Sequence, residues 1–333
     1  MSCLLPLRHM TGVFFLGTLI MLSFPGFSCG AAISVSGEVK RPLTLTTIEL
    51  RSMPPFSIRN VTLLDEKNNS TDPEKLLKVA SYKGVLLRDL LERAGMKHIR
   101  KYEPGALIRV RGADGREVLF SFGEVFYSSI GRSVLLSYEQ DGKALEPHNG
   151  IELVVATDVR AGRRIQDVRE IVVERADIKL EAYADKTKKV VRPPSTLITL
   201  TDDRNPAERT ITLDNLKTLS SVRIDDAVMT GDCEGFRGVY SFEGPTLKTV
   251  LESSGVNMSD RNYGRHVVIS SSDGFCAVYS FGEILNSRLS DNIIIAWRKN
   301  GKLISEDGFA RSVVREDSTG GRSVRRIARI EIH

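Results

Sequence analysis

Two cysteines offer the most distinctive side-chain chemistry in the body of this 333-residue chain. Cys233 lies in a Cys-Glu-Gly triplet, and Cys276 lies shortly after the Asp273-Gly274 pair. A thiolate can bind a soft metal, whereas two thiols in an oxidising compartment can pair with each other. Cys233 is therefore a metal ligand, a disulfide partner of Cys276 or a thiol with no special role, and the residue types alone leave all three interpretations open.

Basic and hydroxyl side chains gather near the C-terminus. Arg311 lies in the segment G-F-A-R-S-V-V, and Arg322, Ser323 and Arg325 lie in the block G-G-R-S-V-R-R. Guanidinium groups bind phosphate-like anions through charge-assisted hydrogen bonds. Basic residues on an edge strand also deter aggregation, so the pattern is consistent with an anion site or with a protected edge.

Several other kinds of site are missing from the sequence. It has no Cys-x-x-Cys-His haem site, zinc cluster, phosphate loop or Gly-x-Ser-x-Gly elbow. His148, in Pro-His-Asn-Gly, is interpreted as a turn residue. The 47 basic and 42 acidic residues give a formal charge of +5 and are interspersed, so we expect no nucleic-acid partner.

The first 32 residues are typical of a secretory signal peptide. Arg8 and His9 precede an apolar run over residues 11–24, and small residues follow through Ala32. The run is short for a membrane-spanning helix, and no transmembrane segment is expected in the mature chain. The sequence thus predicts a periplasmic or secreted protein. The alternative is a lipoprotein anchored at Cys29, although Gly26 stands where such signals usually have Leu.

The rest of the chain contains a tandem repeat. Four blocks recur in the same order at an offset of 159 or 160 residues, as for Asp114 and Asp273 (273 − 114 = 159). A period of this length indicates duplicated domains, not a solenoid. The paired blocks are Y-K-G-V-L-L-R-D-L-L-E with F-E-G-P-T-L-K-T-V-L-E, D-G-R-E-V-L-F-S-F-G-E with D-G-F-C-A-V-Y-S-F-G-E, D-G-K with N-G-K, and G-R-R-I with G-R-S-V.

The blocks predict mixed α+β domains in which strands dominate. Leucines at helical spacing after Gly84 predict a helix that ends near Gly95, and D-G pairs predict turns between strands. The two S-F-G-E segments predict a strand followed by a helix that a serine caps. We define copy 1 as residues 33–181, a charged and proline-bearing linker as residues 182–195, and copy 2 as residues 196–333.

The set of motifs resembles the molybdopterin-binding domain of the sulfite oxidase family. The opening I-S-V-S-G-E-V-K-R-P-L is similar to that family's entry strand, and Y-K-G-V-L-L-R-D-L-L is similar to its W-x-G-V-P-L-R-D-L-L helix. The tail G-G-R-S-V-R-R-I-A-R-I-E-I resembles its G-G-R-S-V-K-W-V-x-R-I-E-V block. The resemblance implies two copies of the family's α+β fold over nearly all of the mature chain.

The resemblance also implies which residues would hold a molybdenum cofactor. In that family a cysteine thiolate ligates molybdenum, and basic side chains hold the phosphate of the pterin. Copy 1 has Asp65 and Glu66 near the place of the cysteine, so we expect no molybdenum there. In copy 2, Cys233 would be the metal ligand, although it precedes Gly244 by fewer residues than the family pattern leads us to expect, and the family's cofactor-facing histidine has no evident match. The remaining cofactor contacts would be Arg311, Arg322, Ser323 and Arg325.

Two functions from different classes remain. The first is a non-catalytic binding or interaction module that has the fold but no cofactor, with an exported protein or a small anionic ligand as its partner. The second is a molybdopterin-dependent oxidoreductase that uses copy 2 alone. We expect the first, because both copies depart from the family's ligand pattern and a fold by itself does not make an enzyme.

Limited proteolysis of the mature chain tests the two-copy organisation. We expect the first cut within residues 182–195, where charge and prolines predict an extended connection, leaving two stable fragments of similar size. Mass spectrometry of the fragments locates the cut. Cleavage mainly between Gly84 and Gly95 would contradict the assignment, because that segment is a helix inside copy 1.

Overall fold

The structure is a computed structural model of the chain, and it describes residues 32–64, 77–96, 105–145, 150–178, 194–231, 235–258, 262–305, 308–318 and 320–333. The expected signal peptide, except Ala32, and most of the expected linker lie outside these ranges. So do Asp65, Glu66, His148 and Cys233.

The same elements occur twice in the same order. Copy 1 contains β1 (Ala32–Gly37), β2 (Leu43–Thr46), α1 (Thr47–Arg51), β3 (Phe56–Leu64), β4 (Leu77–Leu86), α3 (Leu87–Arg93), β5 (Ala106–Gly112), β6 (Glu117–Ser121), α4 (Phe122–Phe126), η1 (Ser129–Arg132), β7 (Val134–Gln140), β8 (Lys143–Ala144), β9 (Glu152–Val155), η2 (Ala161–Arg163) and β10 (Val168–Arg175). The predicted mixed α+β fold is confirmed.

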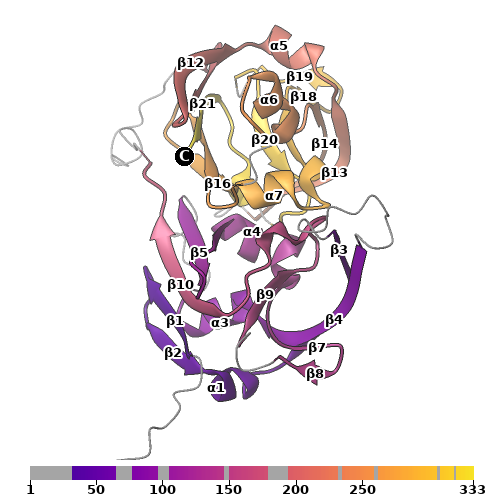
Figure 1. Cartoon of the computed structure of the whole chain (residues 1–333). Helices are drawn as coiled ribbons and strands as arrows, with labels where there is room; N and C mark the ends of the chain where they lie inside the picture. The colour runs from indigo at the N-terminus through magenta and orange to yellow at the C-terminus, as the bar shows by residue number, and fades with distance from the viewer. Residues whose placement is uncertain are drawn as a thin grey trace, which may run out of the picture.

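Copy 2 repeats this series with one strand divided. It contains β11 (Ile198–Asp202), β12 (Asn205–Ile211), α5 (Leu213–Thr218), β13 (Val222–Gly231), β14 (Gly235–Gly244), α6 (Leu247–Ser253), β15 (His266–Ser271), β16 (Cys276–Ser280), α7 (Phe281–Leu285), η3 (Ser290–Asn292), β17 (Ile293–Ala296), β18 (Arg298–Lys299), β19 (Lys302–Leu303), β20 (Arg311–Val314), η4 (Gly320–Arg322) and β21 (Ile327–Ile332). In Figure 1 it forms the orange-to-yellow half above copy 1.

Each copy closes one mixed sheet with its own first and last strands. The strand order β2-β1-β10-β5-β6 in copy 1 corresponds to β12-β11-β21-β15-β16 in copy 2. The pairs β1–β10 and β11–β21 are parallel, whereas the other neighbours are antiparallel. A second sheet, β3-β4-β7-β8 in copy 1, begins with the hairpin that corresponds to β13–β14 in copy 2.

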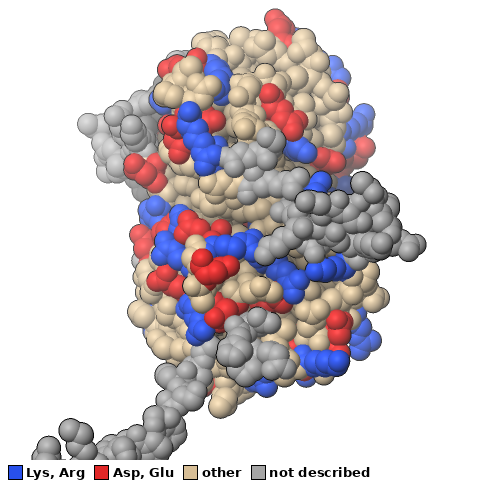
Figure 2. Space-filling view, in the orientation of Figure 1, with Lys and Arg blue, Asp and Glu red and all other residues tan. Residues whose placement is uncertain are grey.

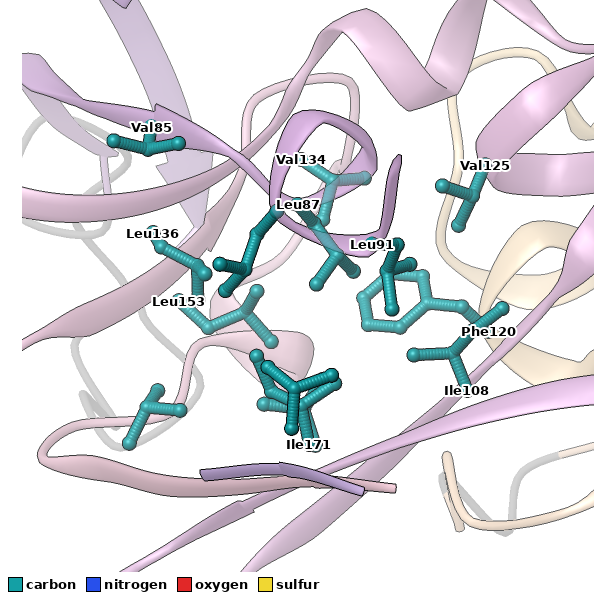
Figure 3. Packing of buried hydrophobic residues seen from close by; sticks show 14 of the residues in the cluster. Val85, Leu87, Leu91, Ile108, Phe120, Val125, Val134, Leu136, Leu153 and Ile171 are labelled. Atoms are coloured by element: carbon teal, nitrogen blue, oxygen red, sulfur yellow. The ribbon is translucent and has the colours of Figure 1, made fainter. Parts of the chain in front are cut away.

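The core of each copy lies between its sheets and its short helices. In copy 1, Leu87 and Leu91 from α3 meet Phe120 of β6 and Ile171 of β10, as Figure 3 shows. Each leucine that leaves water in this way contributes roughly 1.5–3 kcal/mol. The repeated glycine of the helix motif has a packing role, because a Cβ on Gly84 would lie 2.1 Å from the carbonyl oxygen of Leu136.

The surface seen in Figure 2 includes a mixed patch of charges on copy 1, over β5 and its neighbours. Arg109 bonds Glu174 and Glu117, and Arg111 bonds Glu117 and Glu170. Basic and acidic groups alternate across these strands, as the interspersed charges of the sequence indicate. In the ranges that the structure describes, no helix has the length and apolar character needed to cross a membrane.

The two copies meet through α4 and α7, which face each other across the middle of Figure 1. Beside these helices, strands β6 and β16 bring apolar side chains of both copies together. This apolar contact contains Leu107, Leu119 and Ala176 of copy 1 and Val268, Cys276 and Val278 of copy 2. A separate contact inserts Tyr263 of copy 2 into the core of copy 1.

A buried group of ion pairs occupies the centre of this interface, and we call it the inter-copy cluster. In copy 1, Arg163 donates to both oxygens of Asp158, at 2.9 and 2.6 Å, and to Glu124. Copy 2 has the same arrangement, in which Arg322 donates to Asp317, at 2.8 and 2.6 Å, and to Glu283, at 2.6 Å. These six residues define the cluster.

The S-F-G-E segments join the two halves of the cluster, because the serine of each copy bonds the glutamate of the other. Ser121 donates to Glu283 of the other copy at 2.8 Å, and Ser280 donates to Glu124 at 2.7 Å. Each serine also caps its own helix, as the sequence predicts. The glycines provide space for the arginines: a Cβ on Gly123 would lie 2.2 Å from Cδ of Arg322, and a Cβ on Gly282 would lie 2.4 Å from Cδ of Arg163.

The cluster contains four carboxyl groups and two guanidinium groups, nearly all of them out of contact with water. Burial raises the pKa of Glu124 to about 7; the positive charge of Arg163 opposes the rise, and Glu283 adds to it. Burial likewise raises the pKa of Asp158 and of Asp317 against the effect of their arginines. An excess of buried negative charge therefore favours proton uptake by the cluster.

The raised pKa of Glu124 predicts a stability that falls with rising pH. The folded protein keeps a proton that the unfolded chain releases near the ordinary value of 4.5, so this contribution is complete below 4.5 and is lost as the pH rises through about 7. Glu124→Gln imitates the protonated carboxyl. In urea unfolding, its free energy of unfolding should fall less than that of the wild type between about pH 5 and about pH 8.

The matched control is Glu208→Gln, because Glu208 is exposed on β12. This variant should show the pH dependence of the wild type. If Glu124→Gln also followed the wild-type curve, Glu124 would titrate alike in the folded and unfolded chains, and the proposed proton uptake would be wrong.

Candidate anion-binding site

A pocket of about 320 Å³ lies in copy 2 between four segments that are distant in sequence. One wall is the β13–β14 hairpin, with Met229, Thr230 and Arg237, and another is the turn between β15 and β16, with Asp273. Strand β20 and the η4 turn, with the residues that follow it, complete the lining and contribute Arg311, Gly320, Gly321, Ser323 and Arg325. This volume is near the lower end of the roughly 300–1,000 Å³ typical of ligand pockets, so a small ligand is favoured.

Arg311 is held in place at this pocket by packing and hydrogen bonds. Its guanidinium donates to the Ser323 hydroxyl at 2.8 and 3.2 Å, and that hydroxyl donates to the carbonyl of Ser312 at 2.8 Å. The guanidinium also lies 5.2 Å from the ring centre of Phe242. Arg311 and Arg325 are partners in an antiparallel backbone bridge, so both arginines project from neighbouring positions.

The charge of the lining favours an anion. Among the described residues that line the pocket, Arg237, Arg311 and Arg325 are basic and Asp273 is the only acidic residue. Arginine binds carboxylate and phosphate oxygens through parallel N–H bonds, and these are stronger than bonds between neutral groups. The pocket can therefore bind a compact oxyanion.

At the corresponding place in copy 1, the described residues enclose a much smaller cavity. A cavity of about 20 Å³ remains there, lined by Leu63, Lys78, Tyr82, Ala161 and Arg164. Copy 1 has Glu152 and Arg164 at the positions of Arg311 and Ser323, at the same offset of 159 residues. These two side chains bond directly to each other, and Glu152 is buried. An ion pair thus takes the place of the pocket.

The sequence-predicted residues divide into two groups. Arg311, Ser323 and Arg325 come together in the lining of the pocket, and their role as anion contacts stays a prediction. Arg322 does not join them, which corrects its expected place as an anion contact: it is 3% exposed and its guanidinium bonds Asp317 and Glu283. Adjacent residues of a tight turn point in different directions, and the sequence block did not show which of them face outward.

Two charged residues of the pocket were not among the candidates from the sequence. Arg237 lies four positions after Cys233 in the β14 half of the hairpin, and Asp273 belongs to a D-G turn that both copies contain. A signal was available for Arg237 alone, because an arginine near the Cys-Glu-Gly triplet adds to the basic residues of the C-terminal block. Asp273 has an acidic counterpart in copy 1, so the repeat gave no reason to select it.

Cys276 has an interface role in the structure. It is a free thiol, 1% exposed. Because Cys233 lies outside the described residues, the disulfide considered between the two cysteines stays a prediction. The side chain of Cys276 packs in the apolar contact between β6 and β16, and burial raises its pKa to about 11. A protonated thiol in an apolar contact is a poor nucleophile and a poor metal ligand.

The two histidines of copy 2 also lie away from the pocket. His266 and His333 stack on each other with ring centres 5.2 Å apart, and neither lines it. Burial lowers the pKa of His266 to about 4, with help from His333 and nearby arginines. Within the described part of the chain, no group of three or more His, Cys, Asp or Glu residues could hold a metal ion.

Comparisons with known proteins identify the fold family. Among solved structures, the sulfane dehydrogenase SoxCD from Paracoccus pantotrophus has a TM-score of 0.37 and 16% sequence identity, covering 75% of this chain and 77% of that one. This likeness is too weak to support an argument about function. A comparison with curated protein sequences gave no match. The model of the oxidoreductase molybdopterin binding domain matches residues 31–179 and again residues 201–333, so the chain belongs to that family, with one domain in each copy.

Proposed function

We propose that the chain is an exported, non-catalytic binding protein whose copy 2 holds a small oxyanion. The single observation that supports this most is the pocket of about 320 Å³, with three arginines and one aspartate in its described lining. The counterpart in copy 1 adds to the argument, because its described residues form an ion pair beside a cavity of only about 20 Å³. The signal-like N-terminus supports export to the periplasm or the medium.

The cofactor of the family fits copy 1 poorly. The cavity of about 20 Å³ between its described residues cannot enclose a pterin, and Arg164 is already paired with the buried carboxylate of Glu152. Copy 1 also contains no cysteine in its folded part that could serve as the soft ligand.

Copy 2 fits one end of that cofactor. Arg311 and Arg325 suit the phosphate, but the described residues supply no thiolate, since Cys276 is buried at the interface. Cys233 belongs to the segment between β13 and β14 and lies outside the described residues. The second candidate function, a molybdopterin-dependent oxidoreductase, is favoured by family membership and by the position of this hairpin at the pocket.

Anion binding is tested by calorimetric titration of the mature protein with inorganic phosphate and with sulfate. We expect Arg311→Gln to weaken binding roughly tenfold, because a hydrogen bond to a charged group contributes about 1.5–3 kcal/mol. The control, Arg223→Gln, removes the same charge from an exposed site at the far end of β13 and should bind like the wild type. Equal affinity for all three proteins, or no binding by the wild type, would contradict the proposed pocket.

Metal analysis separates the two functional classes. We expect no molybdenum in protein purified from its native cell envelope, either in the wild type or in Cys233→Ser. Molybdenum in the wild type that is lost in Cys233→Ser would establish the oxidoreductase and overturn our proposal. A free-thiol assay on the wild type tests the alternative disulfide, because two missing thiols would indicate a bond between Cys233 and Cys276.

A further inference from the structure

The anion pocket and the inter-copy cluster share one short segment, the η4 turn with Ser323. Gly320, Gly321 and Ser323 line the pocket, while Arg322 between them points away into the cluster. The backbone of this residue is fixed as well, because its carbonyl oxygen accepts hydrogen bonds from Tyr279 and from Ser312, both at 2.8 Å. The position of this pocket wall therefore depends on where Arg322 is held.

Copy 1 supplies part of what holds Arg322. The guanidinium lies against Gly123, where a Cβ would approach its Cδ to 2.2 Å. Ser121 bonds Glu283 at 2.8 Å and lies 3.5 Å from Nη1 of Arg322. All of these groups are buried, so water cannot take the place of a missing partner.

Copy 1 also fixes the loop that bears Asp317, the second carboxylate bound to Arg322. The backbone N–H of Ser318 donates to the carbonyl of Tyr127 at 3.0 Å. On the other side of Asp317, Glu316 accepts from the Ser129 hydroxyl at 3.2 Å. Both neighbours of Asp317 are thus attached to copy 1.

We infer that copy 1 positions the anion pocket of copy 2, with Gly123 and Ser121 acting through Arg322 on the η4 turn. This inference rests on the proposed function and explains a use for a copy whose own cavity is much smaller. Gly123 and Ser121 are positioning residues, since neither lines the pocket. Copy 2 alone would have the arginines but not the fixed turn between them.

The approximate symmetry of the cluster provides a control for each variant. Gly282 of copy 2 makes room for Arg163 as Gly123 does for Arg322, and Ser280 bonds Glu124 as Ser121 bonds Glu283. The η2 turn, which contains Arg163, borders the cavity of about 20 Å³. Changes on this side act directly on Arg163 and Glu124, and they reach Arg322 only through Glu283 of the same helix.

The test compares Ser121→Ala with Ser280→Ala, and Gly123→Ala with Gly282→Ala, in the full mature chain. Each serine variant loses one helix cap and one bond to a glutamate, so both should lose similar stability. In phosphate titrations we expect Ser121→Ala and Gly123→Ala to bind about fivefold more weakly than the wild type, within the range of couplings through packed networks. Ser280→Ala and Gly282→Ala should weaken binding less than their copy 1 counterparts, because they remove contacts to Glu124 and Arg163 and reach Arg322 only through Glu283 of their own helix.

Amide hydrogen exchange gives a second measurement that needs no ligand. It compares the two serine variants, so it can still be made if a glycine variant is too unstable to titrate. The amides of Ser323 and Val324 should exchange faster in Ser121→Ala than in Ser280→Ala, while the opposite holds for the amide of Arg164. Equal effects of the paired variants on affinity and on exchange would overturn the inference while leaving anion binding intact. If the wild type did not bind phosphate at all, the proposed function would be wrong. In that case the inference would still be tested by amide exchange, and equal exchange rates in Ser121→Ala and Ser280→Ala would overturn it.

Discussion

The contact on which the rest of this structure depends is the pair of buried arginines at the centre of the interface. Arg163 and Arg322 each bond two carboxylates of their own copy, and each lies against a glycine of the other copy. Removing one partner from such a buried pair typically costs about 3–5 kcal/mol, because the remaining charge has no water to solvate it. The arrangement therefore requires both copies to be folded and docked together.

This constraint explains why the S-F-G-E segment occurs in both copies. Its serine caps a helix and bonds a glutamate of the other copy, and its glycine leaves space for the buried arginine of the other copy. Its glutamate binds the buried arginine of its own copy. Substituting any one of the three types would leave a buried polar group unpaired or two atoms overlapping. At the pocket there is no such mutual requirement, and there the two copies differ in both charge and volume.

Much of the fold follows from local pattern in the sequence. The leucines of α3, the D-G turns and the serine caps are signals that act within a few residues, and the structure has each of them near its expected place. The family model matches both segments that the repeat indicates. The exchange between copies was not predictable in this way, because Ser121 and Glu283 are far apart in sequence and their contact depends on how two domains dock.

The candidate site shows the same division between local and long-range information. The basic block over residues 320–326 contains Ser323 and Arg325, which line the pocket with Arg311, but it also contains Arg322, whose side chain lies in the interface. Arg237 and Asp273 reach the pocket from a hairpin and a turn that only the tertiary fold brings near.

One part of the difference between the two pockets is an exchange of charge at two corresponding positions. In copy 1 the carboxylate of Glu152 is buried and needs a cation, and Arg164 reaches across the cavity to supply it. In copy 2 an arginine stands at the first position and a serine at the second, so the hydroxyl of Ser323 orients Arg311 without adding a negative charge. A short side chain also leaves space where Arg164 fills it. At these two positions the same fold thus carries a self-neutralised contact in copy 1 and part of a basic pocket in copy 2.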